Sequence, residues 1–293
     1  MKNYLFILIL SFFSLSQVSA VNEFIRISTN ETDLVLRIDQ KNKRLFQAYL
    51  GTKLMSESDF ASFAFASKGG SDASSPSLGW EVYPVSGTED FFDPAFAIQH
   101  NDGNMTTVLY YVSHDVKQID GNVTETVVTM KDNVYPVEVK LHYVAYAKEN
   151  IIKTWTEILH QEKKPVTISR YASSMLYLES PKYFLTEFSG DWAKEVRMSE
   201  QQLQFGKKII DTKLGSRAAM YAQPFFQLGI GQPVQENQGT VMLGTIGWTG
   251  NFQFTFEIDN ASNLRVISGI NPYASNYELK PNEVFATPEF IFT

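Results

Sequence analysis

Hydrophobic and polar residues alternate along most of the chain from Leu34 onward, which is the pattern of half-buried β-strands. The clearest stretch lies in residues 137–145, where one face of a strand would carry Val137, Val139, Leu141, Tyr143 and Ala145. Similar alternation, or enrichment in β-branched and aromatic residues, predicts further strands at Thr107–Val112, Thr124–Met130, Ile151–Leu159, Val166–Ala172, Thr240–Ile246, Asn251–Ile258 and Leu264–Gly269.

Turn-forming residues separate many of these strands, as in Asn101-Asp102-Gly103-Asn104. Helical signals are few. Glu195–Leu203 could form a short helix, although Met198 and Leu203 alone make a poor apolar stripe. The helical crossovers that a parallel α/β sheet requires are missing. The pattern therefore predicts an all-β sandwich or barrel in one domain, with the Gly- and Ser-rich residues 66–80 as a surface loop.

The first twenty residues have the three parts of a secretory signal peptide. Lys2 supplies a positive start, Tyr4–Phe13 is an apolar run, and Val18-Ser19-Ala20 places small residues before a cut after Ala20. An uncleaved membrane anchor is the alternative, but the run is shorter than the roughly 20 residues that span a bilayer. We expect residues 1–20 to be removed and residues 21–293 to be exported, into a periplasm or the medium.

The net charge and the absence of cysteine limit which partners the chain can bind and what can stabilise its fold. The formal net charge is −7 and the pI is about 5.2, which argues against a nucleic-acid binder because such a surface repels phosphate. The chain has no cysteine, so burial rather than disulfides must stabilise the exported fold, and an N-terminal lipid anchor on cysteine is excluded. We therefore expect neither nucleic acid nor a stable membrane anchor among its partners.

Residue sets for several catalytic chemistries are absent or incomplete. The four histidines, His100, His114, His142 and His160, are scattered singly along predicted strands, which is unlike a zinc site. There is no G-x-S-x-G nucleophile motif. Gly229-Ile230-Gly231 lacks the third glycine and the helix of a dinucleotide fingerprint. The residues thus predict no metal and no cofactor.

Acidic and aromatic residues leave glycosidase chemistry and sugar binding open. A glycosidase needs two carboxyl groups about 5 to 10 Å apart, and Glu187, Asp191 and Glu195 lie in one aromatic-rich segment. Solvated loop carboxylates are the alternative interpretation. Tryptophan rings could stack on sugars or belong to the core, and the four candidates are Trp80, Trp155, Trp192 and Trp248.

A series of segments makes the sequence more specific. Residues 83–95 (YPVSGTEDFFDPA) resemble the "YP…G-x-x-D-F-R-x-P-A" segment of family 36 glycoside hydrolases, the α-galactosidases. Residues 189–197 (SGDWAKEVR) resemble the "G-x-W-x-R-E-R" segment of the same family. The order and spacing of the whole series extend over roughly residues 30–293, through LYYVSH (109–114), DNVYPVEVKLHYVAY (132–146), NIIKTWTEILH (150–160), DTKLGSR (211–217), WTGNF (248–252), GINP (269–272) and TPE (287–289).

The resemblance implies the N-terminal domain of that family, a large antiparallel β-supersandwich of galactose-mutarotase-like fold with few short helices. In the family a (β/α)8 barrel of about 250 residues follows and carries both catalytic aspartates. The chain ends at Thr293, where that barrel would begin. We therefore expect no catalytic residue in residues 21–293, and no hydrolysis by this chain alone.

The resemblance also implies one contact with substrate. Family members commonly form tetramers in which an N-terminal loop reaches the sugar pocket of a neighbouring subunit, and Asp90 and Phe91 match the motif of that loop. Phe92 stands where the family usually has arginine. A guanidinium donates up to five hydrogen bonds and a benzene ring donates none. Asp90, Phe91 and Phe92 are thus the candidate substrate-contact residues, with a buried turn as the alternative.

Three hypotheses on function follow. The first is the non-catalytic N-terminal domain of a secreted, retaining α-galactosidase that acts on melibiose or raffinose, from a truncated or split gene, with the barrel absent from this chain. The second is a stand-alone carbohydrate-binding or oligomerisation module, in which aromatic rings stack on galactose. The third is a relict fold without function.

Overall fold

A computed structural model describes residues 23–63, 80–88 and 92–293 of the chain. In this part nearly all regular structure is antiparallel β-strand, and the helices are two short 3₁₀ turns, η1 (Glu57–Ser62) and η2 (Gly215–Arg217). The expected all-β fold with few short helices is confirmed. The predicted signal peptide, most of the predicted 66–80 loop, and Asp90 and Phe91 lie outside the described residues. No described helix is long and apolar enough to cross a membrane.

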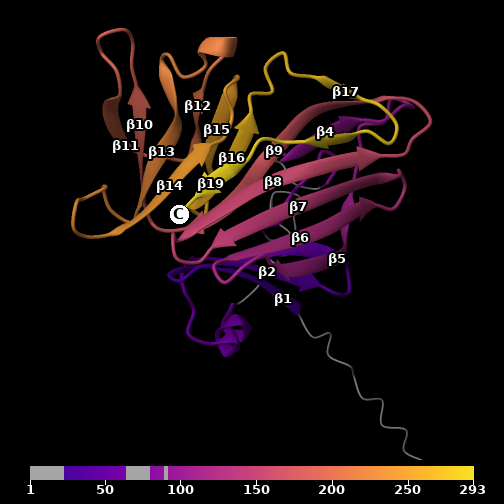
Figure 1. Ribbon diagram of the computed structural model, residues 1–293, viewed down its shortest axis with the longest axis horizontal. Coiled ribbons are helices and arrows are strands. Elements are labelled where there is room, and N and C mark those ends of the chain that lie inside the picture. Colours follow the sequence, from indigo (N-terminus) through magenta and orange to yellow (C-terminus); the bar gives the residue numbers. More distant parts are fainter. Residues whose placement is uncertain (1–22, 64–79, 89–91) are drawn as a thin grey trace, which may run out of the picture.

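Three sheets make up the described fold (Figure 1). The largest has ten strands, in the order β11 (Arg197–Gln202), β10 (Tyr183–Ser189), β13 (Ala222–Ile230), β14 (Thr240–Ile246), β19 (Phe290–Phe292), β8 (Ile151–His160), β7 (Val137–Tyr146), β6 (Val123–Asp132) and β5 (Leu109–Gln118), with β18 (Val284–Ala286) also on β8. The second has six strands, β12 (Gly206–Asp211), β15 (Phe252–Ile258), β16 (Asn263–Ile270), β9 (Val166–Glu179) and β17 (Tyr277–Leu279), with β4 (Phe96–Gln99) on β9.

The third sheet, β1 (Glu23–Ser28), β2 (Thr32–Asp39) and β3 (Arg44–Thr52), is drawn in indigo at the foot of Figure 1. An ion pair joins its first two strands, since Arg26 Nη2 lies 2.7 Å from Asp33 Oδ2. The Asp33 carboxyl is fully buried and also accepts a 2.8 Å hydrogen bond from the Leu54 backbone N–H. The chain after β3 is therefore tied back to the sheet.

The predicted strands are all present, most with small differences in their bounds, but β5 ends at Gln118 rather than Val112 and β9 ends at Glu179 rather than Ala172. β8 alternates strictly between half-buried and buried residues over Ile151–His160, so one face lines the core and the other faces outward. The possible helix at Glu195–Leu203 is not formed, and β11 occupies that segment. All six residues of β11 are exposed, so neither face imposes the apolar alternation that identifies a strand.

The core lies between the two larger sheets. Phe226 of β13 meets Phe254 and Phe256 of β15 edge to face, with ring centroids 5.2 and 4.8 Å apart, and all three side chains are fully buried. Gly244 of β14 makes room for this cluster, because a β-carbon there would lie 2.3 Å from Phe226 Cζ. Aromatic packing of this kind joins the sheets into a sandwich.

Candidate functional site

Phe92 is the member of the predicted substrate-contact motif that the structure describes, and its ring packs on the protein's own sheet. Arg265 of β16 places its guanidinium carbon 4.1 Å from the centroid of that ring, and this arginine is 4% exposed. The same guanidinium lies 5.4 Å from the ring of Tyr177, which stacks on Trp80 at 5.6 Å. A desolvated cation between two aromatic faces is strongly held. Phe92 is therefore part of a packed stack.

Asp93, the next residue, is bound by cations from two different strands. Its Oδ2 lies 2.7 Å from Lys207 Nζ of β12 and 3.2 Å from Arg170 Nη2 of β9. Burial opposes ionisation of Asp93, but the hydrogen bonds from Lys207 and Arg170 outweigh it and lower the pKa of this carboxyl. Phe92 and Asp93 thus attach the C-terminal side of the motif to the six-stranded sheet.

One row across the six-stranded sheet supplies much of this attachment. Lys207 of β12 is paired with Glu257 of β15, Glu257 with Arg265 of β16, and Arg265 with Tyr177 of β9. Lys207 Nζ also lies 3.5 Å from Glu257 Oε1. Directly opposite residues on antiparallel strands point to the same face. The register therefore gathers these four side chains beneath Phe92 and Asp93.

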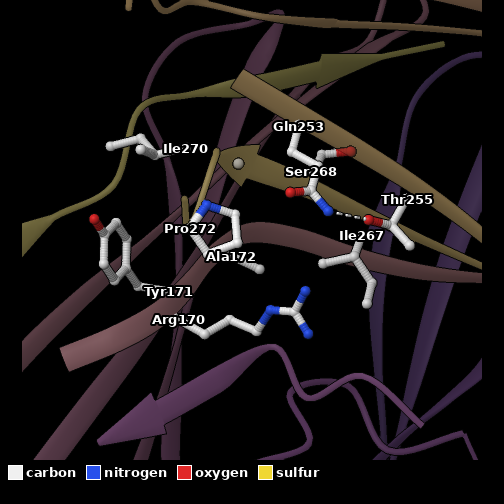
Figure 2. Close-up of a pocket in the computed structure, with 10 residues that line it drawn as sticks. Arg170, Tyr171, Ala172, Gln253, Thr255, Ile267, Ser268, Ile270 and Pro272 are labelled. Atoms are coloured by element: carbon white, nitrogen blue, oxygen red, sulfur yellow. Dashed lines mark hydrogen bonds between the residues drawn. The ribbon is translucent and has the colours of Figure 1, made fainter. Parts of the chain in front are cut away.

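A small pocket adjoins this segment on the same sheet (Figure 2). Its lining includes Arg170 and Tyr171 of β9, Gln253 and Thr255 of β15, and Pro272, and Gln253 Nε2 donates a 2.8 Å hydrogen bond to Thr255 Oγ1. The cavity volume is about 20 Å³, which is room for about one water molecule. This pocket therefore does not enclose a hexose, whose sites are usually hundreds of Å³.

The carboxylates considered for glycosidase chemistry are used in local structure. Glu187 of β10 accepts a 2.8 Å hydrogen bond from Lys208 Nζ. Asp191 accepts from the Trp192 backbone N–H at 2.7 Å, and Glu195 accepts from that of Ala193 at 3.0 Å. The last two thus stabilise the turn between β10 and β11, as the alternative interpretation expected.

The four histidines have separate surroundings. His100 is buried, with Nδ1 2.7 Å from Glu162 Oε1 and Nε2 2.9 Å from Thr107 Oγ1. His160 Nε2 bonds the Leu279 carbonyl, His114 bonds the Tyr111 hydroxyl, and His142 stacks on Trp155 at 4.4 Å. Within the described ranges no three His, Cys, Asp or Glu side chains gather as metal ligands.

The four tryptophans divide between packing and exposure. Trp80 stacks on Tyr177, and Trp155 on His142. Trp248 is 40% exposed, and Trp192, at the β10–β11 turn, is 85% exposed. The interpretation of the tryptophans as core residues therefore fits Trp80, which packs against the core, but neither Trp155, on the outward face of β8, nor Trp192.

Sequence reasoning missed the cations that hold Phe92 and Asp93. Arg170, Lys207 and Arg265 are far from the motif along the chain, and only the sheet register brings them to it. One signal was present: Arg265 is a charge inside the strand sequence NLRVISGI, which is otherwise suited to burial. A charge in such a strand needs a partner.

The described chain is an antiparallel β-sandwich whose larger sheet has ten strands and whose six-stranded sheet holds Phe92 and Asp93 through Arg265, Lys207 and Arg170. The family model "Glycosyl hydrolase family 36 N-terminal domain" matches residues 43–280, and the chain belongs to that family. The resemblance found in the sequence is thereby confirmed.

Among curated proteins, alpha-galactosidase 2 of Pediococcus pentosaceus is 27% identical over 225 residues, covering 72% of this chain and 31% of the relative. Alpha-galactosidase 2 of Hypocrea jecorina is 28% identical over 222 residues, covering 71% and 30%. The chain thus matches less than a third of the length of these relatives.

Solved structures agree on the fold. The α-galactosidase of Lactobacillus brevis superposes with a TM-score of 0.83 at 25% identity, over 93% of this chain and 39% of that one. AgaA of Geobacillus stearothermophilus superposes with a TM-score of 0.84 at 22% identity, over 92% and 40%. The whole sandwich therefore corresponds to one part of larger α-galactosidases.

Proposed function

We propose that this chain acts as the non-catalytic N-terminal domain of an α-galactosidase. In this role it works with a (β/α)8 barrel, which removes terminal α-linked galactose from oligosaccharides such as melibiose and raffinose. The observation that carries the proposal is the superposition of nearly the whole sandwich on 40% of the AgaA chain. Variants of AgaA have been crystallised with raffinose and with stachyose, which supports this substrate class.

The proposal includes a contact between the motif at residues 90–92 and a sugar held by a neighbouring subunit. Phe92 and Asp93 are bound to strands β9, β12 and β16, so the motif is attached at a defined point of the sheet. Because the Phe92 ring already packs on Arg265, Asp90 is the member best suited to accept hydrogen bonds from sugar hydroxyls.

We also propose export, by a signal peptide cleaved after Ala20. The support is the charge and apolar pattern of residues 1–20. Expression in a secreting host followed by mass measurement tests it: the exported chain should begin at Val21. An exported chain that still begins at Met1 contradicts cleavage.

A domain replacement tests the main proposal. The N-terminal part of AgaA that this sandwich matches is exchanged for residues 21–293, and hydrolysis of raffinose is measured. We expect a soluble, active chimera, because the fold corresponds over 92% of this chain. A folded chimera without activity would count against the assignment.

The same chimera tests the sugar contact separately. Asp90→Ala should raise the KM for raffinose about tenfold with little change in kcat, since a hydrogen bond to a charged group contributes about 1.5 kcal/mol or more. Asp115→Ala, on the exposed part of β5, is the matched control. If the chimera is active and the two variants have the same KM, the domain assignment stands and the proposed sugar contact is wrong.

The chain by itself is expected not to hydrolyse 4-nitrophenyl α-galactoside. Turnover that disappears when a carboxylate of this chain is replaced would overturn the non-catalytic assignment. Calorimetry with galactose, melibiose and raffinose tests the alternative of a stand-alone carbohydrate-binding module. Heat of binding at millimolar sugar, with an inactive chimera, would favour that alternative.

A further inference from the structure

His142 of β7 lies between two carboxylates, one from each neighbouring strand of the ten-stranded sheet (Figure 1). Its Nδ1 is 3.4 Å from Glu125 Oε1 of β6, and its Nε2 is 3.5 Å from Glu157 Oε2 of β8. The register explains this, because His142 is directly opposite Val127 and Trp155, and each glutamate is two residues from one of these positions. Both glutamates thus lie diagonally across from the imidazole, within reach of a long side chain.

A neutral imidazole cannot donate a hydrogen bond to both carboxylates. It has one N–H donor and one nitrogen with a lone pair, and an ionised carboxylate only accepts. One ring nitrogen of His142 therefore faces an acceptor with no proton between them. His142 Nε2 is buried and has no hydrogen-bond partner among the described residues, as this mismatch requires.

His100 and His160, the other buried histidines, show how a neutral ring can be satisfied. His100 Nδ1 faces a carboxylate, but its Nε2 is 2.9 Å from the Thr107 hydroxyl, which can donate. His160 Nε2 bonds the Leu279 carbonyl, and its Nδ1 accepts from the Glu162 backbone N–H. A neutral imidazole can make each of these pairs of contacts, but it cannot make the pair at β7.

The charges around His142 leave its two carboxylates without another cation. The ionisable groups on this face and its neighbouring strands are Asp115 and Lys117 of β5, Glu125 and Lys131 of β6, Glu138 and Lys140 of β7, Lys153 and Glu157 of β8, and Glu289 before β19. The lysines of β6, β7 and β8 pair with Glu138 or Glu289. In the described part of the chain, Glu125 and Glu157 pair with His142 alone. The imidazole is therefore the group that can supply the missing positive charge.

We propose that His142 takes up a second proton in mild acid and then clamps β6, β7 and β8 together by donating hydrogen bonds to both Glu125 and Glu157. This inference goes beyond the proposed function and does not rest on it. Histidine is the side chain that ordinarily changes charge between about pH 5 and pH 8, where glutamates stay ionised. The stabilisation is therefore fully present in mild acid and is lost as the pH rises through this range.

Burial opposes the charge, because His142 is 9% exposed, but several contacts of the folded sheet favour it. Protonation replaces the unfavourable contact at Nε2 by a second charge-assisted hydrogen bond, and it reduces the repulsion between the two carboxylates. The ring also stacks on Trp155, with centroids 4.4 Å apart, and an aromatic face attracts a cation. Lys153 lies 5.5 Å from the same indole, but Glu289 neutralises its charge.

Nitrogen-15 NMR of the histidine side chains tests proton uptake in the unaltered chain. We expect the His142 ring to carry one proton at pH 8 and to carry protons on both Nδ1 and Nε2 at pH 5.5. The signals that disappear in His142→Gln assign this ring. A His142 ring that still carries a single proton at pH 5.5 contradicts the proposal.

Denaturant unfolding at pH 8 and at pH 5.5 tests the clamp. On this change of pH the folding equilibrium constant of the wild type should gain about fivefold relative to that of His142→Gln. The double variant Glu125→Gln/Glu157→Gln keeps the side-chain shapes but removes both charges, so it should lose the same gain. The matched control is His114→Gln, at a half-buried histidine of β5 that bonds a tyrosine hydroxyl, and it should keep the gain.

Two results of this comparison contradict the clamp. The first is a double variant that keeps the wild-type gain, because the proton then does not act through the two glutamates. The second is an equal loss in His142→Gln and His114→Gln, because the effect is then not particular to the site between the carboxylates.

Discussion

The guanidinium of Arg265 lies 4.1 Å from the centroid of the Phe92 ring, although the two residues are far apart along the chain. Phe92 occupies the motif position where the family pattern has arginine, and a cation of β16 lies against its ring. The ring thereby covers a charge that is 4% exposed. The contact fastens the candidate substrate-contact segment to the six-stranded sheet.

Phe92→Ala should destabilise the fold by about 2 kcal/mol, because it removes a half-buried ring and its cation–π contact with Arg265. Phe92→Leu should lose about half as much, since it keeps an apolar side chain but no ring face. Urea unfolding measures both. Equal stability of the wild type and the leucine variant would show that the ring face contributes nothing.

Arg26→Met should destabilise the protein by about 3 kcal/mol, because it leaves the fully buried Asp33 carboxylate without its cation. The double variant Arg26→Met/Asp33→Asn should regain part of that loss. Arg217→Met, at an exposed arginine of η2, is the matched control. Thermal and denaturant unfolding measure the stability of the three variants. If Arg26→Met is as stable as Arg217→Met, the Arg26–Asp33 ion pair does not contribute to stability.

The free energy of unfolding should fall as the pH drops below about 4. Burial opposes ionisation of Asp33 and of Asp93, but hydrogen bonds from Arg26 and from Lys207 with Arg170 leave the pKa of each below its ordinary 3.8. A lowered folded-state pKa means that the unfolded chain binds more protons in this range. The stabilisation by the ionised Asp33 and Asp93 is therefore complete when the pH is above their unfolded-state pKa. It is lost as the pH falls through their lower, folded-state pKa.

Denaturant unfolding between pH 6 and pH 2 measures this loss. Asp93→Asn should be less stable than wild type at neutral pH and show a shallower decline in acid. If the variant and the wild type decline in parallel, Asp93 does not contribute to the acid sensitivity.

Gly244→Ala should destabilise by about 2 kcal/mol or more, since overpacking a core typically costs 1 to 3 kcal/mol. The new β-carbon would lie 2.3 Å from Phe226 Cζ and 3.0 Å from Phe290 Cζ. Gly121→Ala is the matched control, because its β-carbon would meet nothing within 4 Å. Similar stabilities of the two variants would mean that the aromatic cluster can move aside.

Much of the fold could be predicted from the sequence, for a physical reason visible in particular strands. β7 and β8 each have one face in the core, so their alternation appears directly in the sequence. β11 has both faces exposed and therefore had no such signal. The candidate site was predicted only in part. The motif is a contiguous segment that the sequence shows directly, but the cations that contact it, Arg170, Lys207 and Arg265, are distant along the chain.

The sequence by itself determined the all-β class and the family, since both depend on patterns read along the chain. Only the tertiary structure decided what Phe92 and Asp93 contact and which of the described strands end each sheet. Those facts depend on sheet order and register, which place Lys207, Arg170 and Arg265 beside a distant segment and leave β11 at the end of its sheet. Pairing between strands follows from the packing of the whole core, and no local stretch of sequence contains it.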